Sequence, residues 1–221
     1  MIAAALVIVD DGMGNLFNLQ RAFERLDIEA KVATDPGQVE RAGAIVLPGV
    51  GAFDTAIHTL RDCGLVPVIR RAAVSGIPVL GICLGMQLLA TESNEGGNFP
   101  GLDLIPGAVR RLRSPDEQTS NFKVPQMGWN EIYSDVDASR GDTILDEIPD
   151  ETKFYFLHSY VVDLENRSDL LARCRYGRDE FPAVVQRENV FGCQFHPERS
   201  GAMGLKLLRN FAALIKRKDI R

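Results

Sequence analysis

Hydrophobic residues in the first half of the chain form short continuous runs that alternate with segments of helical periodicity. Such runs lie at residues 2–9 and 44–47, and two further short strands are predicted at residues 30–33 and 77–82. Continuous apolar runs are typical of strands that are buried on both faces of a parallel sheet. After the first run, apolar side chains at helical spacing fall on one face, namely Leu16, Leu19, Phe23 and Leu26. Strands that alternate with helices in this way predict an α/β fold.

The second half has shorter runs that are typical of strands in a partly antiparallel arrangement. Strands are predicted at residues 131–133, 154–162, 170–176, 183–187 and 190–195, and helices at residues 66–74, 84–91 and 204–216. The polar segment 114–121 predicts an exposed loop. With no internal repeat or clear linker, we expect one domain over residues 1–221. Its mostly parallel sheet carries helices on both faces and an antiparallel elaboration in the second half.

Composition and charge narrow the classes of function. The chain has 221 residues, a formal net charge of −5 and four cysteines, none of them in a C-x-x-C pair. Without a basic surplus we expect no nucleic-acid partner, and without paired cysteines we expect no zinc site. The apolar N-terminal run is short and continues into Asp10, so it predicts a strand and not a signal peptide or membrane span. We therefore expect a cytoplasmic protein with reduced thiols and no membrane partner.

One cysteine lies in a setting that favours a nucleophile. Gly81-Ile82-Cys83-Leu84-Gly85 follows a predicted strand and begins a predicted helix, which is the arrangement of a nucleophile elbow. The glycines leave room where side chains would clash with strand and helix, and the start of the helix favours the reactive thiolate. A buried structural cysteine is the alternative for such a turn. The flanking glycines favour the nucleophile.

A cysteine nucleophile needs a base and a group that orients the base. Of the three histidines, His196 is the best candidate, because it ends an apolar strand and Glu198 follows two residues later. Spacing alone leaves open whether Glu198 contacts His196 or faces solvent. His58 is predicted on a surface helix, and His158 at a strand edge. The glycine-rich segment 48–51 follows a strand and can offer backbone N–H groups to an oxyanion, although it can equally be a simple crossing loop.

Together these segments resemble the class I (triad-type) glutamine amidotransferases, and within them the glutaminase subunits of imidazole glycerol phosphate synthases. The resemblance runs over nearly the whole chain. Its marks are Asp11-Gly12-Met13-Gly14-Asn15-Leu16, Pro48-Gly49-Val50-Gly51-Ala52-Phe53, Gly81-Ile82-Cys83-Leu84-Gly85-Met86-Gln87, Pro125-Gln126-Met127-Gly128-Trp129-Asn130, His158-Ser159-Tyr160 and Gln194-Phe195-His196-Pro197-Glu198. The resemblance implies a flavodoxin-like sheet and an enzyme that needs neither cofactor nor metal.

The resemblance also implies roles for the matching positions. Cys83 would attack the carboxamide of glutamine, His196 would transfer the proton, and Glu198 would orient His196. Backbone N–H groups would hold the oxyanion, and other side chains would grip L-glutamine or meet a partner. The oxyanion set is Val50 or Gly51 with Leu84, the substrate set is Gln87, Glu95, His158, Ser159 and Tyr160, and the interface set is Asn15, Trp129, Asn130 and Arg199.

The partner implied by the resemblance is a synthase (cyclase) subunit that forms a heterodimer and receives ammonia through a channel for histidine biosynthesis. Three positions depart from the family's usual residues: Asp11 replaces Tyr, Gln126 replaces His and Arg199 replaces Lys. These departures leave open a related subunit that feeds another synthase, such as one that aminates a surface sugar. A related cysteine hydrolase or protease that acts alone, and a catalytically silent binding subunit, are the remaining alternatives. The triad and the Met-Gly-Trp-Asn segment speak against both.

Overall fold

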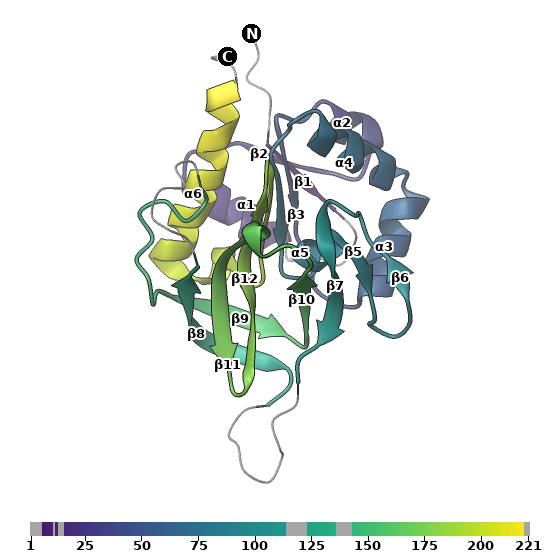
Figure 1. Cartoon of the computed structure of the whole chain (residues 1–221). Helices are drawn as coiled ribbons and strands as arrows, with labels where there is room; N and C mark the ends of the chain where they lie inside the picture. The colour runs from purple at the N-terminus through teal and green to yellow at the C-terminus, as the bar shows by residue number, and fades with distance from the viewer. Residues whose placement is uncertain (1–5, 11, 13–15, 114–122, 136–142, 219–221) are drawn as a thin grey trace.

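A nine-stranded sheet forms the centre of the molecule (Figure 1). The computed structural model describes residues 6–10, 12, 16–113, 123–135 and 143–218. In spatial order the strands are β2 (Ala30–Ala33), β1 (Leu6–Val9), β3 (Ala44–Leu47), β4 (Val79–Ile82), β13 (Val190–Cys193), β12 (Asp179–Arg187), β11 (Leu170–Tyr176), β8 (Gln126–Ser134) and β9 (Lys153–His158). Strands β2 to β13 of this order run parallel, and β12, β11, β8 and β9 continue the sheet antiparallel.

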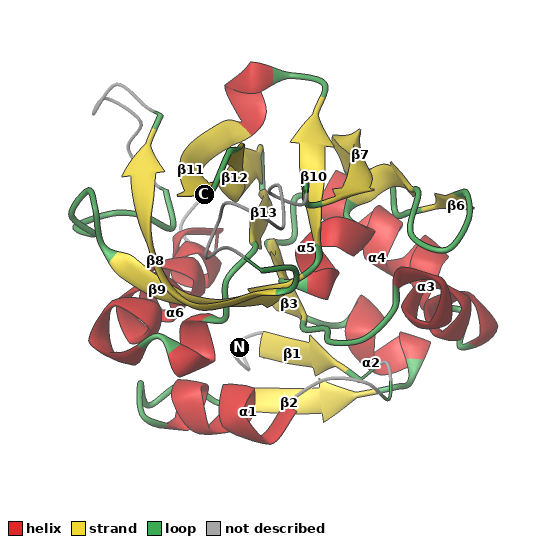
Figure 2. Ribbon diagram, turned by 90° about the horizontal axis from the view of Figure 1, so that it is seen from below, coloured by secondary structure: helices red, strands yellow, loops and turns green. Residues whose placement is uncertain are grey.

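Helices cover both faces of the parallel strands (Figure 2). The helices are α1 (Leu16–Glu24), α2 (Pro36–Glu40), α3 (Phe53–Asp62), α4 (Leu65–Val74), α5 (Leu84–Leu88) and α6 (Gly201–Lys218). Ile8 of β1 belongs to the apolar cluster of α1 and α6, which includes Phe23 and Phe211. The next residue, Val9, belongs to the cluster of α3, α4 and α5. Because successive strand side chains point to opposite faces, continuous apolar runs fill both clusters, which confirms the predicted α/β fold.

A second, four-stranded sheet was not predicted, and it changes the expected end of one helix. Its order is β10 (Tyr160–Leu164), β7 (Ile105–Arg111), β5 (Ala90–Ser93) and β6 (Phe99–Pro100). The helix predicted over 84–91 ends at Leu88 instead. The carbonyl groups of residues 88–91 accept hydrogen bonds from the amides of residues 101–105 and so do not continue the helix. This pairing joins segments that local periodicity cannot connect.

The strand predicted over 154–162 is two strands that belong to different sheets. Strand β9 ends at His158 in the main sheet, and β10 begins at Tyr160 in the second. Ser159 lies between them, and its carbonyl accepts a hydrogen bond from the amide of Leu112, at 2.8 Å. The segment predicted as one strand therefore contributes to both sheets, which brings residues 158–160 to their junction.

The ends of three parallel strands place the predicted chemistry together. Strands β3, β4 and β13 are neighbours, and they are followed by the segment 48–52, Cys83 and His196. This is the carboxyl edge of the sheet, where ligand sites of open α/β folds form. Within the described ranges, no helix is both long and apolar enough to cross a membrane. Asn15, Asp11 and the predicted loop 114–121 lie outside the described residues.

Candidate active site

Cys83 occupies the strained turn that the sequence predicts. Its backbone has φ 54° and ψ −109°, a conformation that non-glycine residues rarely adopt. A Cβ at Gly85 would lie 1.8 Å from the carbonyl oxygen of Leu47, and one at Gly81 would lie 2.5 Å from the carbonyl oxygen of Gly85. Both glycines are therefore required by the close approach of α5 to β3 and β4. This packing holds the Cys83 side chain at the start of α5.

The spacing left open whether Glu198 contacts His196, and in the structure the two form a buried pair. The imidazole Nδ1 lies 2.9 Å from Glu198 Oε1, and the two side chains are 5% and 4% exposed. Glu198 belongs to a short 3₁₀ turn, η2 (Pro197–Arg199). The backbone of His196 is fixed by its amide, which donates to the carbonyl of Tyr155 at 2.9 Å, and by Ser200 Oγ, which donates to its carbonyl at 2.6 Å. The imidazole is thereby oriented from two sides.

The electrostatics of His196 favour its charged form. Burial alone would lower the pKa of His196, but the Cys83 sulfur and the Glu198 carboxylate outweigh it and raise this pKa to about 10. The buried Nε2 has no partner in good hydrogen-bond geometry among the described residues. Because Nδ1 is engaged by Glu198, Nε2 is the nitrogen left to exchange a proton. An imidazolium beside Cys83 stabilises negative charge on the sulfur, as nucleophilic catalysis requires.

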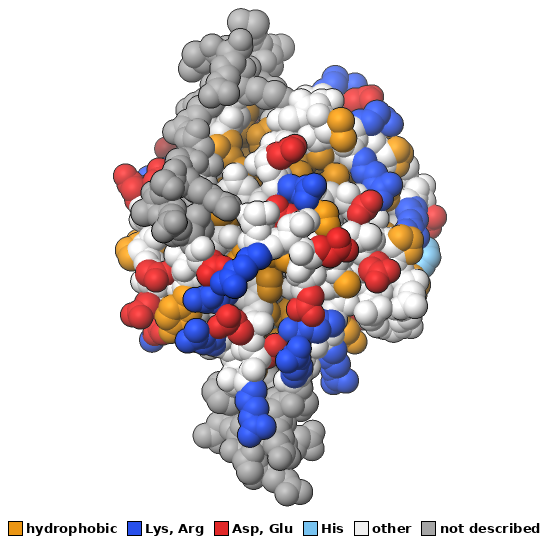
Figure 3. All heavy atoms as spheres, viewed as in Figure 1, with side chains coloured by type: hydrophobic (Ala, Val, Ile, Leu, Met, Phe, Trp, Pro, Cys, Tyr) orange, Lys and Arg blue, Asp and Glu red, His pale blue; other side chains and the backbone are white. Residues whose placement is uncertain are grey.

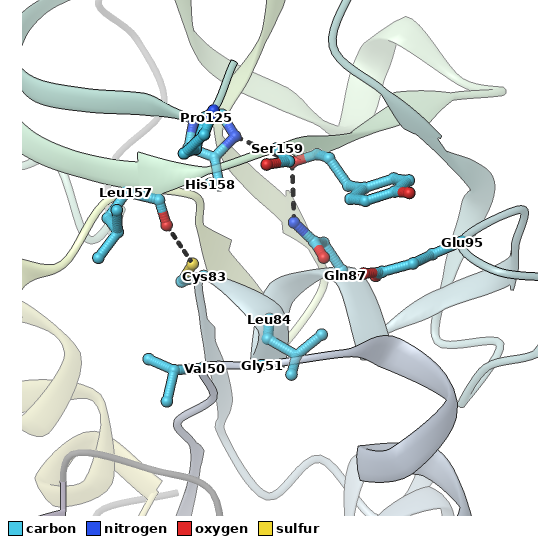
Figure 4. A pocket seen from close by; sticks show the side chains of 11 residues that line it. Val50, Gly51, Cys83, Leu84, Gln87, Glu95, Pro125, Leu157, His158 and Ser159 are labelled. Atoms are coloured by element: carbon cyan, nitrogen blue, oxygen red, sulfur yellow. Dashed lines mark hydrogen bonds between the residues drawn. The ribbon is translucent and has the colours of Figure 1, made fainter. Parts of the chain in front are cut away.

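A cavity of about 270 Å³ opens in front of Cys83 (Figure 4). It is lined by Val50, Gly51, Cys83, Leu84, Gln87, Glu95, Pro125, Leu157, His158, Ser159 and Tyr160. The cavity therefore gathers the nucleophile with every residue of the predicted oxyanion and substrate sets. His196 and Glu198 line a smaller adjoining space of about 10 Å³, and Val50 borders both spaces.

The predicted oxyanion loop lies against the start of α5. A Cβ at Gly49 would come within 2.8 Å of Leu84 Cβ, so the loop and the helix are in close contact. Gly51 has φ 102°, which an L side chain rarely adopts. Among the described residues no hydrogen bond engages the amides of Val50 or Gly51. Leu84 is the first residue of α5, so its amide has no acceptor within the helix. The loop can therefore supply donors beside Cys83.

The side chains of the predicted substrate set are tied to one another. Gln87 Nε2 donates to the carbonyl of Tyr160 at 2.9 Å, and His158 Nδ1 donates to the same carbonyl at 2.9 Å. Burial lowers the pKa of His158 to about 3, against the raising effect of the Tyr160 carbonyl and with a further lowering by His196. His158 is therefore neutral at physiological pH. It helps to fix the lip of the cavity at the junction of the two sheets.

Two groups near the nucleophile were missed by sequence reasoning. Gln194 is fully buried, and its Nε2 lies 3.7 Å from Cys83 Sγ while its Oε1 accepts from Gln87 Nε2 at 3.2 Å. Its place two residues before His196 was the available signal. The carbonyl of Leu157 accepts from the Cys83 thiol at 3.6 Å. A backbone carbonyl leaves no trace in the side-chain pattern, so no signal could have identified it.

The predicted interface residues fall into different environments. Trp129 is 53% exposed and lies edge-on to Tyr155, with ring centroids 6.1 Å apart. The guanidinium of Arg199 lies 4.2 Å from the centre of the same Tyr155 ring. Asn130 Oδ1 instead accepts from the buried Gln126 Nε2 at 2.9 Å. Gln126 therefore lies in the interior and not on an exposed surface. Asn15 lies outside the described residues.

Comparison with known proteins gives a consistent family. The family model described as glutamine amidotransferase class-I matches residues 7–215. Imidazole glycerol phosphate synthase subunit HisH of Moorella thermoacetica is 44% identical, covering 96% of this chain and 95% of that protein. The protein of the same name from Syntrophotalea carbinolica is 46% identical over 93% and 98% of the two chains. A crystal structure of a glutamine amidotransferase has a TM-score of 0.71 at 23% identity, covering 95% of this chain and 98% of that one, and it supports the fold alone.

Proposed function

Because this chain belongs to the class I glutamine amidotransferase family, we propose that it hydrolyses glutamine and supplies ammonia to the cyclase subunit of an imidazole glycerol phosphate synthase. Relatives that are 44% and 46% identical and matched along nearly their whole length carry the name of that synthase's HisH subunit. The observation that carries the chemical proposal is the strained Cys83 elbow, which faces a cavity lined by Gln87 and Glu95 and lies beside the His196–Glu198 pair. This arrangement supports acyl transfer through a thioester.

The proposed reaction begins with Cys83 Sγ attacking the carboxamide carbon of glutamine. The oxyanion that forms accepts hydrogen bonds from the backbone amides of Val50 or Gly51 and of Leu84. The C–N bond then breaks, and His196 delivers the proton that lets ammonia leave, while Glu198 keeps the imidazole oriented. Water, deprotonated by His196, attacks the thioester and releases glutamate. Gln87, Glu95 and residues 158–160 hold the amino-acid end of the substrate.

A partner subunit follows from the chemistry of the product. Ammonia in water at neutral pH is largely protonated, and the ammonium ion is no longer a nucleophile. A closed route from Cys83 to the acceptor would prevent this loss and exclude side reactions. We propose a heterodimer with such a channel, in which the partner also sets the oxyanion loop before glutamine is hydrolysed. The partner would use the ammonia to form two products, imidazole glycerol phosphate and an aminoimidazole carboxamide ribotide.

The test of this function is glutamate release from glutamine by the purified chain, with and without the cyclase subunit and its phosphorylated ligand. We expect feeble turnover by the chain alone and strong stimulation by partner and ligand together. Cys83→Ala should abolish glutamate release while the circular dichroism spectrum is unchanged. Glutamate release by Cys83→Ala at the wild-type rate would refute the mechanism. Stimulation only by a different synthase and its ligand would instead support the alternative of another ammonia acceptor.

A further inference from the structure

The carboxylate of Glu95 holds the start of α3 from a distant part of the chain. Glu95 Oε2 accepts a hydrogen bond from the amide of Phe53, the first residue of α3, at 3.2 Å. The N-cap residue Ala52 is extended, with φ −98° and ψ 141°, and has no side chain that can cap the helix. Helix N-termini leave amides that need acceptors and favour negative charge. Glu95 therefore supplies in space the cap that the local sequence lacks.

This contact fixes the far end of the proposed oxyanion loop. At the near end Gly49 lies against Leu84, so closely that a Cβ added at Gly49 would be 2.8 Å from Leu84 Cβ. Phe53 is anchored by Glu95 only two residues after Gly51. The free amides of Val50 and Gly51 thus lie between two fixed points. In Figure 4, Glu95 reaches the cavity from beside Gln87, while Val50 and Gly51 lie on the side nearer α3.

We propose that Glu95, besides gripping glutamine, is a positioning residue that couples substrate binding to the setting of the oxyanion loop. The proposal rests on the proposed glutaminase function. A carboxylate has two oxygens, so Oε2 can stay on Phe53 while Oε1 meets the α-ammonium of glutamine. An ammonium beside the carboxylate keeps it ionised, and an ionised carboxylate is the stronger acceptor for an amide. A filled cavity therefore tightens the anchor of the loop that stabilises the transition state.

Burial around Glu95 makes this coupling effective. Desolvation raises the pKa of the Glu95 carboxyl, the Phe53 amide lowers it, and Asp54 raises it again, with a net upward shift. Substrate charge has more effect on a half-buried carboxyl of this kind than on an exposed one, because solvent screens it less. A ligand without an ammonium group would fill the cavity but would not strengthen the contact between Glu95 and Phe53. Only a ligand such as glutamine would therefore set the oxyanion loop.

A pair of substitutions separates the positioning role from simple substrate binding. Glu95→Gln keeps an oxygen for Phe53, but this oxygen is neutral and a weaker acceptor, and the charge that meets the ammonium is lost, so KM should rise and kcat should fall about threefold. Glu95→Ala loses both, so KM should rise and kcat should fall about tenfold, measured with saturating cyclase partner. Adding Ala52→Ser to Glu95→Ala provides a local cap, and it should restore several-fold of kcat without lowering KM. Ala52→Ser alone is the matched control and should leave both parameters near wild type.

Hydrogen exchange at Phe53 tests the same proposal without turnover. Glu95→Ala should speed exchange of the Phe53 amide about tenfold, and Glu95→Gln should speed it less, because the amide oxygen remains as a weaker acceptor. In Cys83→Ala protein, saturating glutamine should slow this exchange, and Glu95→Gln should remove that slowing. The coupling is overturned if glutamine leaves Phe53 exchange unchanged, or if Glu95→Ala alters KM alone. If Phe53 responds as expected but the wild-type chain releases no glutamate, the proposed function fails and the anchor remains.

Discussion

Cys83 and His196 influence each other through charge, and this is visible in the pKa of the histidine. The strained backbone of Cys83 holds the sulfur on the wall of the cavity, and Glu198 holds the imidazole beside it. Burial opposes the charged imidazole, so the raised pKa depends on both neighbours. The nucleophile and the base are thus parts of one electrostatic unit. Removing either neighbour should be detectable at His196 itself.

Substitution of each neighbour should lower the pKa of His196. Cys83→Ala removes the larger favourable influence, and Glu198→Gln removes the smaller one, so the first change should have the greater effect. In both variants the pKa of His196 should fall from about 10 toward the ordinary value of 6.5. NMR titration of the imidazole ring measures this directly. An unchanged pKa in Cys83→Ala would contradict the coupling, and His58, which is exposed, serves as the internal control.

The raised pKa of His196 also sets the direction of the pH dependence of stability. The folded pKa of about 10 lies above the ordinary value of 6.5, so the folded state binds the proton more tightly. The stabilisation is therefore complete below pH 6.5 and is lost as the pH rises through about 10. Urea unfolding at a series of pH values should show the free energy of unfolding declining over this window. In Glu198→Gln the free energy of unfolding should decline less over this window. An equal decline would contradict the assignment of the pH dependence to the raised pKa of His196.

At the residue scale the sequence predicted the reacting groups better than their surroundings. Cys83 stood out because glycines flank it, and His196 because Glu198 follows at a spacing that one turn can close. Glu95 had no such signal, since its contact with Phe53 spans 42 positions. Only the family resemblance identified it as a candidate. The amide of Gln194 and the carbonyl of Leu157 contact Cys83 through folding alone, which no local pattern records.

At the scale of the elements, the sequence pattern predicted the strands whose bounds depend on residues close to one another in the chain. Strands β2 and β3 have the predicted bounds, because each is a short segment between turn residues. Strand β5 was missed because its partners β6 and β7 come later in the chain, and their pairing overrides the helical propensity of residues 89–91. The break at Ser159 has the same origin. The second sheet places residues 158–160 on the cavity, so the element that was hardest to predict shapes the substrate site.

Close contact between β3 and α5 makes Gly85 the most sensitive position of the elbow. A methyl group there would lie 1.8 Å from the carbonyl oxygen of Leu47, which is backbone and cannot move aside. We expect Gly85→Ala to lower the free energy of unfolding by about 3 kcal/mol or more. Gly96→Ala is the matched control, because Gly96 has φ 68° and no atom within 4 Å of a Cβ. That control should cost only about 1–2 kcal/mol.

Denaturant titration with circular dichroism detection measures both glycine variants. If Gly85→Ala costs no more than Gly96→Ala, the packing of α5 against β3 is not what requires a glycine. A Gly85→Ala protein that remains folded at low temperature should also hydrolyse glutamine more slowly. The reason is that any shift of α5 moves Cys83 and the Leu84 amide away from the loop at residues 48–51.

Over the surface of the molecule, charged side chains of both signs are mixed, whereas several large apolar side chains are exposed near β8 and α1. Acidic and basic side chains are interspersed across the face drawn in Figure 3. Large exposed apolar side chains include Phe17, Met127 and Trp129, at 64%, 68% and 53% exposure. Met127 and Trp129 lie on the outer side of β8, and α1, which carries Phe17, packs against η2 with its exposed Arg199. Exposed apolar residues beside an active site are typical of a surface that binds a partner.

The exposed surface around Trp129 should contribute much of the free energy of binding to the partner. The Trp129 ring packs on Tyr155, whose carbonyl also accepts the amide of His196, so the surface is rigid and directly connected to the base. Because tryptophan is the most frequent hot-spot residue, Trp129→Ala should weaken binding to the cyclase subunit at least about tenfold. The matched control is Val74→Ala, which is 87% exposed on α4, a helix that packs against α2 and α3.

Isothermal titration calorimetry with the purified cyclase measures both variants, and the unfolding curve of each confirms that the fold is retained. Arg199→Ala should weaken binding less than Trp129→Ala, because the Arg199 guanidinium already contacts the Tyr155 ring of its own chain. Cys83→Ala should bind the cyclase as wild type, since the sulfur lies inside the cavity and away from this surface. Wild-type affinity in Trp129→Ala would place the interface elsewhere, whereas weaker binding by Val74→Ala would move it to the α4 face.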